Sequence, residues 1–215
     1  MASRLFVSVV IVAATALGAP LGASAASAAG CTGNVQFADA FGQADPGWPT
    51  SDNFSIGGGK FQIKPDAGKD VWSIYGASLF GDADICVDVS VSAASDPTGP
   101  GAGVVFWLAD SNNYYGVYIA PNGFAAINRI QNGKVLSPVS WRKATSLKTG
   151  ANAVNTIRLT LKGNSISCYF NDQLFYTIQG AQPQGGGQFG LEAWSEKANP
   201  NIWSFTNLKV TDPSQ

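Results

Sequence analysis

The chain has 215 residues, 45% of them hydrophobic, and carries 13 basic against 14 acidic residues for a formal charge of −1. A balanced charge with no basic patch argues against a nucleic-acid partner. The sequence contains no histidine, which excludes Ser-His-Asp and Cys-His catalysis and the common zinc sites.

The N-terminal segment has the pattern of a secretory signal peptide. A single basic residue precedes the mostly apolar stretch Leu5–Leu21, and Ala-x-Ala cleavage sites that end at Ala25 or Ala28 follow it. A membrane anchor is the alternative, but glycine and proline interrupt the end of this stretch. We therefore expect a signal peptide over residues 1–29 and a single exported domain over residues 30–215, periplasmic or extracellular, with no membrane span in the mature protein.

Three cysteines in an exported chain predict one disulfide and one free thiol. In the segment DICVDVSVS the alternate apolar residues share one face, so Cys86 points the opposite way, whereas Cys168 lies on an apolar face of its own segment. We predict a disulfide between Cys31 and Cys86 and a buried Cys168. Residues 28–31 also loosely resemble a lipoprotein cleavage box, which leaves a lipidated Cys31 as an alternative.

The region from Gly103 to Tyr176 consists of short segments in which apolar and polar residues alternate. No helical apolar periodicity follows residue 30. The residues between the segments favour the positive φ angles of hairpin turns: Asn122-Gly123, Asn132-Gly133, Gly163-Asn164 and Asn171-Asp172. This pattern predicts an all-β protein, a two-sheet antiparallel jelly-roll sandwich.

The alternation gives each predicted strand a core face and an open face. In residues 103–109 the bulky apolar side chains alternate so that Trp107 falls on the open face. In the next segment the same rule places Tyr114 and Tyr118 there. These aromatic residues are candidates for stacking against a ligand.

The predicted turn after this segment fixes the register of the following strand. If Asn122-Gly123 is a two-residue turn, Gly116 lies opposite Arg129, and Arg129 joins the open face.

The C-terminal segment QFGLEAWSEK alternates in the same way and turns Glu192, Trp194 and Glu196 outward together. A sugar suits such a face, because its apolar side stacks on aromatic rings while its hydroxyls bond to Arg or carboxylate groups. The predicted ligand-binding residues are Trp107, Tyr114, Tyr118, Arg129, Glu192 and Trp194.

Glycoside hydrolysis usually requires two carboxyl groups about 5 to 9.5 Å apart. Glu192 and Glu196 are the only glutamates, and four strand residues separate them by about 13 Å, which is too far for such a pair. If the chain is an enzyme, we expect either glutamate to act with another carboxylate, such as Asp110 or Asp172, although both have the positions of turn residues.

We expect no cofactor. The segment FADAFGQADPGW offers oxygen ligands from Asp39 and Asp45, so a structural calcium ion is a weak alternative, although the spacing matches no EF-hand loop.

The chain resembles the concanavalin A-like jelly rolls, and most of all the laminin-G-like 3-keto-disaccharide hydrolase domain family. The segments that carry the resemblance are, in order, FADAF, GGGKFQI, GVVFW, NYYGVYIAPNG and FTNLKV. Members of that family often carry G-I-F-F-R followed by Y-E-x-Q-I, whose Arg, Glu and Gln face a concave groove. Here Trp107, Gly116 and Tyr118 stand at those three positions. The resemblance implies a glycan-binding concave sheet, and the three replacements favour binding over hydrolysis.

We therefore predict an exported, monomeric jelly-roll domain that binds a carbohydrate on its concave sheet without catalysis. One alternative is a glycoside hydrolase that acts on disaccharides or 3-keto-glycosides. Another is a structural, envelope-interaction module, which a covered open face or a buried Trp107 would favour. Since the aromatic residues and Arg129 do not titrate between about pH 5 and 8, we expect the affinity to be flat over that range.

Overall fold

The computed structural model describes residues 30–92, 100–197 and 200–213. The predicted signal peptide, residues 1–29, lies outside them. The described residues form fourteen β-strands and no helix, and all named strand pairs are antiparallel. The predicted all-β class is confirmed.

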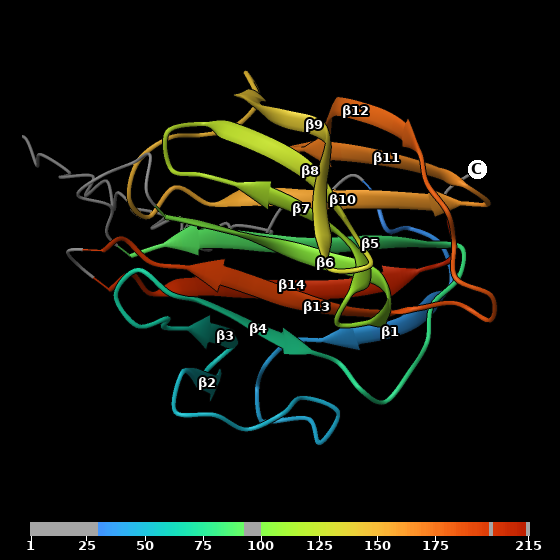
Figure 1. Ribbon diagram of the computed structural model, residues 1–215. Helices are drawn as coiled ribbons and strands as arrows, with labels where there is room; N and C mark the ends of the chain where they lie inside the picture. The colour runs from blue at the N-terminus through green and yellow to red at the C-terminus, as the bar shows by residue number, and fades with distance from the viewer. Residues whose placement is uncertain (1–29, 93–99, 198–199, 214–215) are drawn as a thin grey trace, which may run out of the picture.

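The strands form two sheets that pack face to face (Figure 1). The larger sheet contains, in spatial order, β12 (Gln173–Gln179), β11 (Ser165–Phe170), β10 (Asn155–Lys162), β5 (Ala83–Val91), β14 (Trp203–Thr211), β3 (Lys60–Ile63) and β2 (Phe54–Gly57), with β1 (Val35–Asp39) paired to β14. The smaller sheet contains β4 (Asp70–Ile74), β13 (Gln188–Trp194), β6 (Gly101–Asp110), β7 (Asn113–Ile119), β8 (Phe124–Gln131) and β9 (Lys134–Lys143).

The core lies between the sheets and is built from alternate strand residues. In β10, for example, Ile157, Leu159 and Leu161 are buried, whereas the residues between them are half-buried. Aromatic rings fill part of this core, where Trp48 packs edge-on against Phe61 with ring centroids 5.0 Å apart. Each such contact adds about 0.5–1.5 kcal/mol beyond the area that it buries.

Hairpin chemistry accounts for two of the predicted turns directly. Asn132 and Gly133 have φ angles of 51° and 71°, which is the positive pair that a two-residue type I′ turn requires. Asn171 and Asp172 likewise have φ angles of 50° and 66°. The sequence therefore places the β8–β9 and β11–β12 connections correctly.

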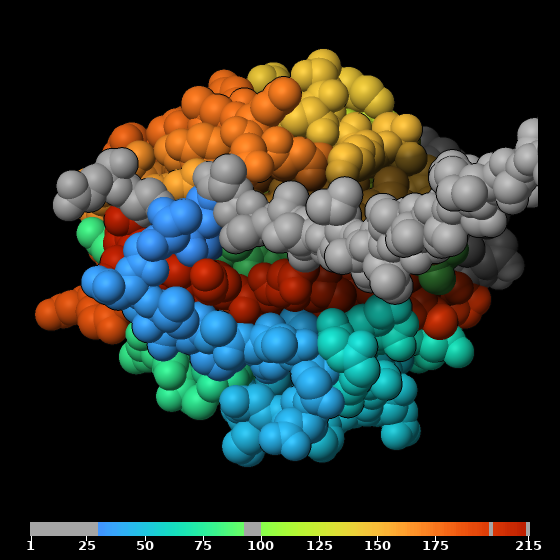
Figure 2. Space-filling model, turned by 180° about the vertical axis from the view of Figure 1, so that it is seen from behind, coloured from blue at the N-terminus to red at the C-terminus, as the bar shows by residue number. Residues whose placement is uncertain are grey.

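The predicted disulfide between Cys31 and Cys86 is present, and Cys168 is a buried free thiol. Because Cys31 is paired, it has no thiol that could carry a lipid, so the lipidation alternative is wrong. The disulfide ties the described N-terminal residues to the larger sheet, where β1 lies beside β14 (Figure 2). Within the described part of the chain, no helix has the length and apolarity needed to cross a bilayer.

Candidate functional site

The outward face of the smaller sheet brings a carboxylate and a tyrosine together. The strand register sets Glu192 of β13 opposite Gly103 of β6, and Gly103 opposite Tyr118 of β7. Since residues opposite one another share a face, all three project away from the core. The Tyr118 hydroxyl reaches across β6 and donates a hydrogen bond to Glu192 Oε2 at 2.7 Å.

This face makes Glu192 an unusual acid. Burial raises the pKa of its carboxyl from 4.5 to about 7, the hydrogen bond from Tyr118 opposes that rise, and the negative charge of Asp70 adds to it. Burial and the charge of Glu192 also raise the pKa of Tyr118 well above its usual value. Glu192 therefore changes its charge near neutral pH, which a face made only of aromatic residues and Arg would not do.

Two glycines make room for large rings close to the sheet backbone. A methyl group at Gly101 would overlap the Trp194 ring, and one at Gly116 would overlap the ring and hydroxyl of Tyr118. Trp194 and Tyr118 in turn pack edge to face, with centroids 5.4 Å apart. The small residues thus set the position of Tyr118, and through it the hydrogen bond to Glu192.

Further aromatic residues flank the carboxyl group. Trp72 of β4 packs against Tyr114 of β7 with ring centroids 5.2 Å apart, and Trp141 of β9 packs against Trp194 at 6.0 Å. Trp72 could have been found from the alternation in VWSIY, which puts it on the face opposite Ser73. Trp141 carries no such signal, because two register irregularities interrupt the pairing of β8 with β9.

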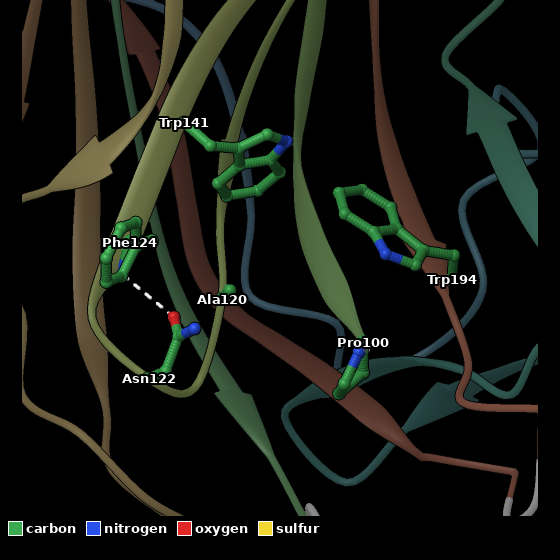
Figure 3. Close-up of a pocket in the computed structure, with 6 residues that line it drawn as sticks. All are labelled: Pro100, Ala120, Asn122, Phe124, Trp141 and Trp194. Carbon is green, nitrogen blue, oxygen red and sulfur yellow. Dashed lines mark hydrogen bonds between the residues drawn. The ribbon is translucent and has the colours of Figure 1, made fainter. Parts of the chain in front are cut away.

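A hollow of about 180 Å³ opens beside the packed rings of Trp141 and Trp194 (Figure 3). Trp141 is 43% exposed and Phe124 is 38% exposed, so aromatic surface is presented to solvent here. The hollow is lined by Pro100, Ala120, Asn122, Phe124, Trp141 and Trp194. None of the described residues that line it is charged, so these residues suit an uncharged ligand group with an apolar side.

The prediction that Trp107 lies on the open face is wrong. Its side chain is 1% exposed, packs edge-on against Tyr115, and donates its indole N–H to the Gly81 carbonyl at 3.4 Å. The register of β6 on β7 shifts between Phe106 and Asp110, and Trp107 has a φ of 48°. This bulge reverses the alternation and turns the indole inward.

The placement of Arg129 is also wrong, by one residue. The loop after β7 is longer than the predicted two-residue turn, since the Ala120 N–H bonds to the Phe124 carbonyl at 2.9 Å. Asn128 consequently lies opposite Gly116, and Arg129 lies opposite Tyr115 instead. Asn128 takes the open-face position, where its Oδ1 accepts a hydrogen bond from the Ser137 hydroxyl at 3.1 Å.

The other predicted acidic groups do not join the face. Glu196 lies beyond the end of β13 and is 5% exposed, so the expectation that it points outward is wrong. Asp110 is the last residue of β6, and its carboxylate accepts bonds from the Asn112 N–H and from Asn113 Nδ2 in the turn that follows. Asp172 lies in the turn between β11 and β12. Of the predicted open-face residues, Tyr114, Tyr118, Glu192 and Trp194 are the ones that the structure brings together.

The proposed calcium ligands have other partners. Asp39 Oδ1 accepts a hydrogen bond from the Phe41 N–H, and its Oδ2 accepts one from the Trp48 indole at 2.9 Å. Asp45 Oδ1 accepts a bond from the Gly47 N–H at 2.7 Å. The described residues contain no group of three or more acidic or cysteine side chains placed to hold a metal ion.

No family model and no curated protein matches the chain. Solved structures do resemble it. The carbohydrate-binding module CBM66 from Bacillus subtilis is 18% identical, with a TM-score of 0.61 over 77% of this chain and 96% of that one. A Bacillus licheniformis beta-glucanase is 16% identical, with a TM-score of 0.62 over 85% and 100% of the two chains. The carbohydrate recognition domain of Emp46p is 13% identical, with a TM-score of 0.61 over 79% and 90%.

These similarities establish the fold. The chain is a concanavalin A-like jelly-roll sandwich, as the sequence predicts. Membership of the 3-keto-disaccharide hydrolase family stays a prediction.

Proposed function

We propose that this protein is an exported carbohydrate-binding domain whose ligand lies on the open face of the smaller sheet. The observation that carries the proposal is the ring of aromatic side chains around one half-buried carboxyl group, with Tyr118 bonded to Glu192 at 2.7 Å. Support also comes from the similar structures, which include a carbohydrate-binding module and a carbohydrate recognition domain. The disulfide fits an oxidising, extracytoplasmic compartment.

The geometry matches what a sugar ring requires. The apolar side of a sugar ring can stack on Trp141 or Trp194 in the hollow that both residues line. That hollow has the volume of about six waters, at about 30 Å³ each, which is enough for one ring of a longer glycan. The hydroxyls of a neighbouring ring can then bond to Glu192 and Asn128, which lie further along the same face.

Replacing one exposed tryptophan tests the proposal without disturbing the core. We expect Trp141→Ala to weaken glycan binding at least tenfold, measured on a glycan array and by calorimetry on the best ligand. Leu136→Ala is the matched control, because Leu136 lies in the same strand and is 45% exposed but does not line the hollow. The absence of binding to any glycan, or equal binding by both variants, would contradict the proposal.

One observation favours a second function, glycoside hydrolysis. Glu192 has a pKa of about 7, a value suited to a general acid, and the negative charge of Asp70 contributes to raising this pKa. Trp72 lies opposite Glu192 and Asp70 opposite Trp194, so Asp70 is the diagonal neighbour of Glu192. Diagonal neighbours are about 7–8 Å apart, which is compatible with the separation of two catalytic carboxyl groups. Asp70 would then be the partner that the sequence does not identify.

The enzymatic alternative predicts turnover of a disaccharide or a 3-keto-glycoside by the purified protein, and loss of that turnover in both Glu192→Gln and Asp70→Asn. If the wild type binds a glycan but does not hydrolyse it, the enzymatic alternative is wrong and the proposed binding function stands.

A structural, envelope-interaction module is the remaining alternative, and the burial of Trp107 is the observation in its favour. The described N-terminal residues do not cover the open face, since β1 pairs with β14 in the larger sheet.

A further inference from the structure

A second hollow, of about 170 Å³, lies where the β6–β7 turn meets the connection between β12 and β13. Its walls include the aromatic rings of Trp107, Tyr114 and Tyr115, and the residues Ala181 and Pro183 of that connection close another side. It also contains a cation, Arg129, which sequence reasoning placed on the open face.

Among the described residues, Arg129 forms no salt bridge with an acidic side chain. Its guanidinium lies over the Tyr115 ring, 5.3 Å from the ring centroid. Among the side chains that the structure describes, the one salt bridge joins Arg158 to Asp84. The guanidinium is half-buried in an aromatic hollow with its planar fork of N–H donors uncommitted to any carboxylate.

The surroundings supply a second donor. The Tyr115 hydroxyl accepts a hydrogen bond from the Ala181 N–H at 3.0 Å, which leaves its own proton to donate. Asp110, the acidic residue of the adjacent turn, accepts bonds from Asn112 and Asn113, and these bonds hold the pKa of Asp110 below its usual value. The Asp110 carboxylate is thus bonded within its own turn.

We infer that this hollow binds the carboxylate of an acidic sugar, a uronic acid unit of the glycan held on the open face. A guanidinium fork matches a planar carboxylate with two parallel hydrogen bonds, and the flat ring of Tyr114 or Tyr115 can contact the attached sugar. Tyr114 links the two sites, because it lines the hollow and also packs against Trp72 on the open face. The inference rests on the proposed carbohydrate-binding function and specifies its ligand class.

Matched glycans test the charge requirement. The probe is a glycan array that carries uronic acid oligosaccharides beside their neutral methyl esters, together with sulfated and uncharged glycans. We expect the acid to bind at least tenfold more tightly than its ester, and we expect Arg129→Ala to remove this preference by lowering the affinity for the acid. Arg129→Lys should restore it only in part, because an ammonium group lacks the fork.

Arg142→Ala is the matched control, since Arg142 also lies over a tyrosine ring, that of Tyr176 at 5.5 Å, but lines neither hollow. Thermal melting of each variant separates a loss of binding from a loss of folding. If the wild type binds neutral glycans with no preference for acids, prefers sulfated glycans over uronates, or keeps its preference in Arg129→Ala, the inference is wrong and the proposed function stands. If no glycan binds, both the inference and the proposed function are wrong.

Discussion

Glu192 makes the stability of this protein depend on pH in a direction that can be worked out from the structure. The carboxyl has a pKa of about 7 in the folded state, against 4.5 in the absence of its surroundings. Between these values the folded protein keeps a proton that the unfolded chain has released. The free energy of unfolding therefore falls as pH rises, and the favourable contribution, complete below about pH 4.5, is lost as pH rises through about 7.

The size of this effect follows from the two pKa values. A difference between 4.5 and about 7 corresponds to roughly 3 kcal/mol. For a domain of this length, that amounts to roughly 6–12 °C in Tm. Glu192→Gln removes the titration but keeps an oxygen that can accept the hydrogen bond from Tyr118.

The measurement is the free energy of unfolding of the wild type and of Glu192→Gln in urea, at steps from pH 4 to pH 8. Other titrating groups are common to both proteins and cancel in the difference. We expect the variant to gain up to roughly 3 kcal/mol relative to the wild type between the two ends of this range. Tyr118→Phe should raise the pKa of Glu192 further, because the lost hydrogen bond favours the charged form. A difference that does not change with pH would refute the reasoning.

Three further predictions concern Gly116 on the open face, the disulfide and the free thiol. Gly116→Ala should displace the Tyr118 ring, cost about 1–3 kcal/mol in urea unfolding and raise the pKa of Glu192 in an NMR titration; an unchanged pKa would show that Gly116 does not set this hydrogen bond. Reduction of the Cys31–Cys86 disulfide should lower the free energy of unfolding by about 4 kcal/mol, because it opens a loop of 55 residues. Alkylation should label Cys168 alone and only after unfolding, whereas three reactive cysteines in the oxidised protein would contradict the pairing.

The sequence predicts the fold well because the fold depends on repeated local signals. Alternating segments and Asn-Gly turns recur along the chain, so an error in one of them leaves the sandwich intact. The pairing of Cys31 with Cys86 follows from the same alternation, since it needs only the faces of the two segments that carry Cys86 and Cys168. The candidate site depends on single positions instead, and there a one-residue irregularity decides the outcome.

Trp107 and Arg129 illustrate this sensitivity. The segment around Trp107 alternates regularly, and nothing in its composition marks the bulge that turns the indole into the core. For Arg129, a loop one residue longer than a two-residue turn places the side chains of β8 on the face opposite to the predicted one. In both cases the deciding fact is the register between strands, which the sequence of one strand does not contain.

The placement of Glu192 shows the opposite case. Alternation correctly puts it on the open face, but its raised pKa depends on rings that arrive from other strands. In the resembling family a Glu and a Gln stand where this chain has Gly116 and Tyr118. Here the space at Gly116 is occupied by the Tyr118 ring, whose hydroxyl holds a carboxylate supplied by β13. A glutamate at position 116 would collide with that ring, so the two arrangements exclude one another. In this chain the acidic group of the face comes from β13, which is separated from β7 by β6.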